Sequence, residues 1–101
     1  MKNSIIQDDK TVCYLCGERG GYWLHALDKH HVFFGPYRKN SEKYGLTVYL
    51  HHDTCHIFGE DAVHVNADID RELKAEVQKL AMDYYGWDTD TARQICGKNY
   101  I

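Results

Sequence analysis

Two histidines stand side by side in the segment LDKHHVFFG, at positions His30 and His31. Neighbouring side chains of an extended strand point to opposite faces, so each face of this segment would carry an imidazole. A neutral imidazole can bind a metal ion, and an unbound one can remove a proton from water near neutral pH. The pair therefore predicts a division of roles, with one histidine on a metal and its neighbour facing a substrate. Without partners, the simpler interpretation would be one buried and one exposed histidine.

Two further histidines supply partners for such a metal. His56 and His64 could join His30 in a three-histidine cluster that leaves coordination positions open for water and a phosphate oxygen. Histidine ligands alone favour a transition metal, whereas a carboxylate such as Asp53 or Glu60 would shift the preference toward magnesium. The sequence thus predicts a divalent metal site suited to chemistry on a phosphodiester.

A second group of candidate ligands consists of Cys13-x-x-Cys16 and His52-x-x-Cys55. The two-residue spacing lets both side chains of a pair reach one tetrahedral ion from a tight turn. These four residues are predicted to bind a structural zinc ion, which would stabilise a domain with a small core. His51 is the alternative to His52, because the sequence alone does not fix which imidazole faces the ion.

The cysteines also allow other interpretations, namely a redox Cys-x-x-Cys or unrelated buried thiol pairs. A redox motif is typical of a βαβ setting, which the pattern of this chain does not indicate. The fourth cysteine, Cys96, follows the apolar Ile95 and is predicted to be a core residue.

The composition fits one small globular domain. The chain has 101 residues, of which 44% are hydrophobic and 27% are charged. We expect a flexible N-terminal arm over residues 1–11 and a single domain over residues 12–101. No apolar run approaches the roughly 20 residues that span a bilayer, and the N-terminus does not resemble a secretory signal. A cytoplasmic protein without membrane partners is therefore expected.

The net charge of −3 argues against a generally basic, nucleic-acid-binding surface. Arg38 and Lys39 nevertheless lie in the locally basic segment 36–43. Together with Lys29 and Lys43, they could present one positive face to phosphate.

The elements that must position these residues follow from their periodicity and their turn residues. Strands are predicted over 22–34 and 46–51, with a polar loop over 36–45 between them and a short helical turn or loop over 53–64. A long helix should begin at a cap, Asn66 or Asp68, and end at Gly86. A short last helix should begin at Asp88 or Thr89 and stop at Gly97. The apolar stripe of the long helix comprises Ile69, Leu73, Val77, Leu80 and Tyr84.

These segments together resemble the HNH endonucleases, specifically the small HNH nucleases of phages and prophages. The resemblance covers about residues 13–80 and rests on CYLC, LDKHHVFFG, SEKYGL and the Cys55-His56 step. It implies an α+β fold with a ββα-metal core, in which a hairpin and a helix hold one divalent ion. It also implies that His30 and His56 bind this ion and that His31 is the general base.

Two positions depart from the pattern of that family. Asn40 is assigned to the role of the middle asparagine, which orients the base, although it lies earlier in the chain than is usual. Ser41 or a backbone carbonyl are the alternatives. His52 stands where a cysteine is more common in the family.

The resemblance implies metal-dependent hydrolysis of DNA phosphodiester bonds, in a bacterial or phage-infected cell. The expected cofactors are magnesium, manganese, nickel or zinc at the active site, besides the structural zinc. Arg38 and Lys39 would contact phosphates, which positions the DNA without reading its sequence. The DNA could be duplex, branched or single-stranded. The alternative is a degenerate HNH protein, a zinc-stapled module that binds nucleic acid without cutting it.

Overall fold

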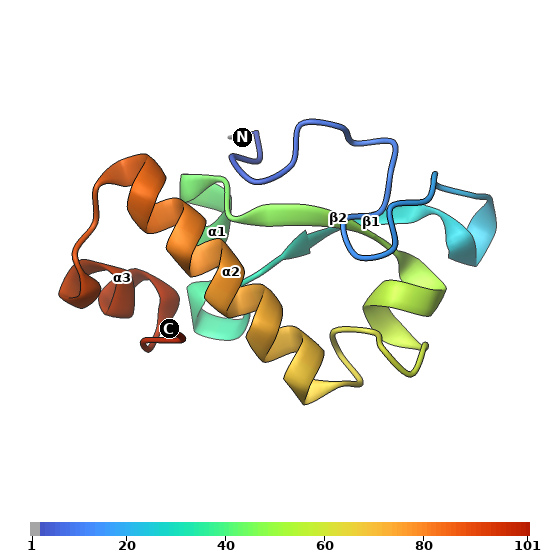
Figure 1. Ribbon diagram of the computed structural model, residues 1–101. Helices are drawn as coiled ribbons and strands as arrows, with labels where there is room; N and C mark the ends of the chain where they lie inside the picture. Colours follow the sequence, from blue (N-terminus) through green and yellow to red (C-terminus); the bar gives the residue numbers. More distant parts are fainter. Residues whose placement is uncertain (1–2) are drawn as a thin grey trace.

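A hairpin of two antiparallel strands forms the centre of the fold (Figure 1). A computed structural model describes residues 3–101. The strands are β1 (Leu27–His31) and β2 (Thr47–His51). Together with the helices described below, these strands confirm the predicted α+β class.

The first strand is shorter than the predicted span of 22–34. A 3-10 turn, η1 (Trp23–His25), comes immediately before it, and β1 ends at His31. The hairpin register places His30 opposite Val48, so the histidine pair lies at the end of β1 that is nearest the connection to β2.

The connection between the strands is helical, so the polar loop predicted over 36–45 is wrong. A 3-10 turn, η2 (Gly35–Tyr37), leads into the helix α1 (Arg38–Tyr44). Pro36 suits the start of a helix, and the arginine, lysine and glutamate residues that follow are good helix formers. Gly45 ends α1 in the left-handed conformation at φ 71°. A Cβ atom there would lie 2.5 Å from the carbonyl oxygen of Asn3, so this turn requires glycine.

Two helices follow the ligand-rich turn, as the sequence predicts. The long helix α2 (Ala67–Tyr85) begins at Asn66, whose side chain accepts hydrogen bonds from the backbone N–H groups of Asp68 and Ile69. It ends at Gly86 in the left-handed conformation. The short helix α3 (Thr89–Cys96) begins at Asp88, whose side chain accepts a hydrogen bond from the backbone N–H of Thr91.

The core lies between the hairpin and α2, which crosses it in Figure 1. Val48 and Leu50 of β2 are fully buried, and Leu73, Val77 and Ala81 of α2 belong to the same buried cluster. The predicted stripe contributes unevenly, however. Leu80 and Tyr84 are exposed, because the buried face of α2 is narrower than the stripe.

The described part of the N-terminal segment runs beside β2, while residues 1–2 of the predicted arm lie outside the described residues. The backbone N–H of Ile5 donates to the carbonyl of Gly45 at 2.9 Å, and the side chain of Gln7 accepts from the N–H of Tyr49 at 2.8 Å. Within residues 3–101, no helix combines the length and the apolar character needed to cross a membrane.

Candidate metal centres

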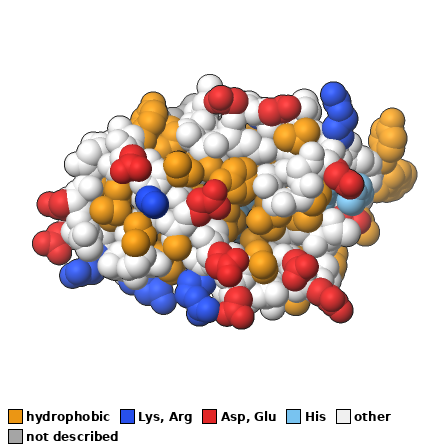
Figure 2. Space-filling model, viewed as in Figure 1, with side chains coloured by type: hydrophobic (Ala, Val, Ile, Leu, Met, Phe, Trp, Pro, Cys, Tyr) orange, Lys and Arg blue, Asp and Glu red, His pale blue; other side chains and the backbone are white. Residues whose placement is uncertain are grey.

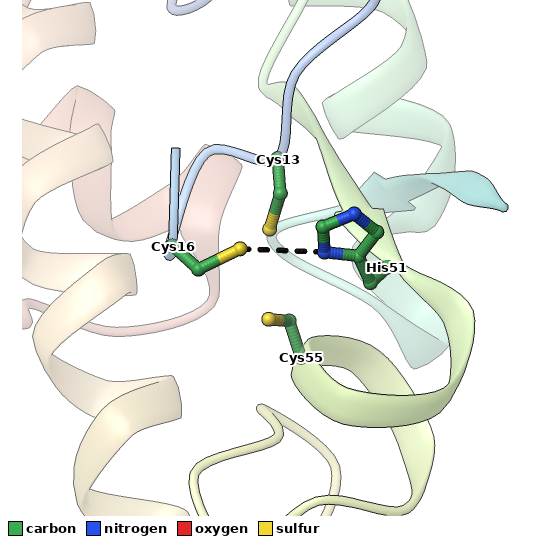
Figure 3. A group of neighbouring side chains, drawn as sticks. All are labelled: Cys13, Cys16, His51 and Cys55. Carbon is green, nitrogen blue, oxygen red and sulfur yellow. Dashed lines mark hydrogen bonds between the residues drawn. The ribbon is translucent and has the colours of Figure 1, made fainter. Parts of the chain in front are cut away.

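Three cysteines and one histidine converge where the N-terminal segment meets the end of β2 (Figure 3). The ligand atoms of Cys13, Cys16, His51 and Cys55 all lie within 4.8 Å of one another. The Cys16 Sγ lies 3.3 Å from the His51 Nδ1. Three thiolates and one imidazole form a ligand set typical of structural zinc sites, so this cluster, the cysteine cluster, could hold zinc.

His51 is oriented for metal binding by its second ring nitrogen. Its Nε2 lies 2.7 Å from the carbonyl oxygen of Arg19, which can only accept a hydrogen bond. The proton therefore belongs on Nε2, and Nδ1 keeps its lone pair toward the sulfur atoms. His51 is fully buried.

The assignment of His52 to the zinc site is wrong, and the alternative, His51, is the residue that joins the cysteines. The reason is the π-helical turn η3 (His52–Ile57), which follows β2 without a break. Residues four apart lie on the same side of such a turn, so His51 and Cys55 face the cysteines together. His52 lies on the other side with His56.

Burial raises the pKa of the Cys55 thiol to about 12. The metal ligand is the thiolate, so this thiol must lose its proton when a metal binds. A bound cation would supply the positive charge that this buried thiolate needs.

A second convergence, the histidine cluster, joins His30 of β1, His56 of η3 and His64 of the turn before α2. The His30 Nδ1 lies 3.2 Å from the His56 Nε2, and the His64 Nε2 lies 3.1 Å from that same atom. The three predicted ligands therefore meet at one point. Neither Asp53 nor Glu60 joins them: Asp53 contacts His25, and Glu60 lines a cavity beside the cysteine cluster.

Backbone hydrogen bonds bring His64 to this cluster. The N–H of His64 donates to the carbonyl of His56 at 3.1 Å, and the N–H of Val63 donates to that of Cys55 at 3.0 Å. The chain reverses tightly at Gly59, where a Cβ atom would lie 2.0 Å from the carbonyl oxygen of Thr54.

The environment of His30 keeps its imidazole neutral. Burial, and then the neighbouring His56 and His64, lower the pKa of His30 to about 3. His64 is exposed, so the cluster is closed on the His30 side and open to solvent on the His64 side. Three imidazoles with an open side form a donor set that fits a divalent transition metal.

Asp28 orients His56 by binding its Nδ1, the ring nitrogen that does not face the histidine cluster, and the sequence predictions missed this role. Its Oδ2 accepts a hydrogen bond from the His56 Nδ1 at 2.9 Å and also contacts the His52 Nδ1. With its proton on Nδ1, His56 presents the lone pair of Nε2 to the cluster. Burial acts to raise the pKa of Asp28, but the hydrogen bonds from His56 and His52 leave it below its ordinary value. The sequence spacing could have indicated this role, since Asp28 precedes His30 by two positions and so lies on the same face of the strand.

His31 lies beside the histidine cluster and outside it. Both members of the histidine pair line an open cavity of about 430 Å³, which also contains His56, His64 and the cationic Lys29 and Arg38. The His31 Nε2 lies 2.7 Å from Glu42 Oε2. His31 is therefore not a member of the histidine cluster, and a general base would have to be unligated in this way.

Of the remaining predicted residues, Arg38 and Lys39 lie next to His31, whereas Asn40, Ser41 and Lys43 do not line the hollow beside it. Arg38 and Lys39 line a second hollow of about 600 Å³ with Lys29, His31 and Glu42. Asn40 points elsewhere and donates to the carbonyl of Ile95 at 3.0 Å.

Ser41, the first alternative to Asn40, is fully buried, and its hydroxyl bonds to the backbone of Phe33. Lys43 lies over the ring of Tyr44 and is absent from both hollows. The predicted core residue Cys96 is buried.

We predict that His51→Ala removes the ion from the cysteine cluster, whereas the matched change His52→Ala leaves it in place. Cobalt substitution measures this site selectively, because thiolate ligands give an intense sulfur-to-cobalt absorption band. Loss of that band in His52→Ala with its retention in His51→Ala would contradict the assignment.

We also predict that Asp28→Asn weakens metal binding at the histidine cluster by about 10- to 100-fold, because the amide no longer fixes His56. Nickel titration calorimetry on protein with a filled cysteine cluster measures the affinity. Asp83→Asn on the exposed side of α2 is the control and should bind nickel normally. An Asp28→Asn affinity equal to that of the control would show that Asp28 does not support the site.

No protein-family model, curated protein or solved structure matches this chain. The similarity to the HNH endonucleases therefore stays a prediction, and the functional argument rests on the geometry of the two clusters.

Proposed function

We propose that this protein is a metal-dependent nuclease that hydrolyses DNA phosphodiester bonds. One observation carries the proposal: three converging imidazole nitrogens share an open cavity with a further histidine and with two cationic side chains. A divalent ion, an unligated imidazole and cations together can catalyse the hydrolysis of a phosphodiester. The cavity supports this chemistry better than a purely structural role, because structural zinc sites are closed.

His30, His56 and His64 would hold the ion. When bound, a divalent ion supplies stabilisation of the negative charge that develops on the phosphate and on the departing oxygen. Three protein ligands leave coordination positions for water and substrate, as in catalytic metal sites generally. Asp28 would keep His56 in the orientation that this binding requires.

His31 would act as the general base. It removes a proton from a water molecule while the water oxygen forms a bond to phosphorus. The bond between phosphorus and the 3′ oxygen breaks, and that oxygen leaves with the electron pair. His31 suits this step because it lines the cavity and is only partly buried.

Lys29, Arg38 and Lys39 would bind phosphates on either side of the cleaved bond. All three line the hollow beside His31. The net charge of −3 does not oppose this, because charge is unevenly distributed. Many of the basic side chains visible on the face that carries α2 gather along its lower left edge, others lie apart from it, and acidic side chains are spread over the whole face (Figure 2). Such phosphate contacts would position DNA without specifying its sequence.

The proposal predicts that His31→Ala reduces nicking of supercoiled plasmid by about 100- to 10,000-fold, the usual contribution of a general base. The assay compares magnesium, manganese, nickel and zinc, with a chelator as the metal-free control. Metal content and the thermal unfolding transition should remain those of the wild type. Gln94→Ala on the exposed side of α3 controls for purification and should cut normally.

Nicking that persists unchanged in His31→Ala would contradict the role of His31 as the general base. DNA binding by the wild type without cleavage under every metal would support the alternative, the zinc-stapled nucleic-acid-binding module.

A further inference from the structure

The hydrogen bond between His31 and Glu42 gives a role to a residue of the SEKYGL segment to which neither the sequence pattern nor the resemblance assigned one. We propose that Glu42 is the positioning residue of the proposed nuclease, holding His31 through its Nε2–H so that Nδ1 faces the substrate. This inference rests on the proposed function. Glu42 would then orient the base, the role predicted for Asn40. The Asn40 side chain instead donates to the carbonyl of Ile95.

The geometry defines both ends of the interaction. Glu42 Oε2 lies 2.7 Å from the His31 Nε2, and Glu42 Oε1 accepts a hydrogen bond from Lys29 Nζ at 3.0 Å. Lys29 and His31 are two positions apart in β1 and therefore share a strand face. Each carboxylate oxygen thus has its own donor, which fixes the carboxylate in one orientation.

An ionised carboxylate can only accept hydrogen bonds, so it selects the imidazole form with the proton on Nε2. The lone pair of Nδ1 is then available to take a proton from water. The hydrogen bonds from Lys29 and His31 lower the pKa of Glu42, which keeps its carboxylate ionised beside the imidazole. A carboxylate that orients a catalytic histidine in this way also stabilises the imidazolium that forms when the base accepts its proton.

The backbone of Glu42 is anchored by its neighbour. Ser41 is fully buried, and its hydroxyl accepts from the N–H of Phe33 at 3.0 Å and donates to the Phe33 carbonyl at 2.7 Å. Phe33 follows His31 by two residues. The helix that carries Glu42 is therefore tied to the chain just beyond the strand that carries the base, so the distance between the two side chains is set by the fold.

Nuclear magnetic resonance of the zinc-loaded protein, labelled with ¹⁵N in histidine, tests this bond without reference to activity. The wild type should show a downfield Nε2–H proton of His31 that exchanges slowly with water. In Glu42→Ala this proton should exchange rapidly with water, so its signal should disappear. In Glu42→Gln the signal should move upfield, because the amide is a weaker acceptor. Glu72→Gln makes the same charge change on the exposed side of α2 and should leave the signal unaltered. The backbone amide spectrum reports whether each variant is folded.

Steady-state cleavage provides the second readout. Glu42→Gln should lower kcat by about tenfold or more, less than the loss of His31 itself, while KM for DNA changes little. An unchanged His31 signal in Glu42→Ala, its absence from the wild type, or a wild-type kcat in Glu42→Gln would each overturn the proposal. A wild type that cuts no DNA would contradict the nuclease function instead, and the resonance measurement would still decide whether Glu42 holds His31.

Discussion

The turn from His51 to His56 carries candidate ligands of both clusters, and its backbone conformation decides which imidazole joins which cluster. The π-helical turn η3 continues directly from β2, and the N–H of Phe58 closes it on the carbonyl of Asp53 at 2.8 Å. His51 and Cys55 face one way and His52 and His56 the other. An ion bound to the cysteines would fix this turn, and with it the direction in which His56 points. The two clusters are therefore coupled through one short stretch of backbone.

This coupling bears on the stability of that end of the molecule. A two-stranded hairpin alone is marginally stable in water, and the buried core reaches the cysteine cluster through Cys13, Cys55 and Val63. Several buried groups near the clusters are polar, among them His30 and His51. Metal ligation at the converging nitrogen and sulfur atoms would cross-link the segment before β1 to the turn after β2. Binding free energy at a structural zinc site contributes directly to the free energy of folding.

The sequence predicted the membership of the clusters better than their geometry. His30, His56 and His64 meet as the ligand spacing suggested, and both helices near the C-terminus begin and end at the expected capping residues. His52 was misassigned because the interpretation assumed a tight zinc turn with two-residue spacing, whereas the chain forms a helical turn with four-residue spacing. The segment 36–45 was taken for a loop on its polarity, although polar helix formers on a solvated surface are equally polar. That error hid Glu42, since only a helix brings its side chain to His31.

The most direct test of the account is anomalous diffraction from crystals of the zinc-loaded protein, recorded at the zinc absorption edge. The account predicts two peaks, one bound by the three sulfur atoms and the His51 Nδ1, and one bound by nitrogen atoms of His30, His56 and His64. A single peak at the cysteine cluster with no ion at the histidine cluster, or His52 in place of His51 beside the sulfur atoms, would contradict it.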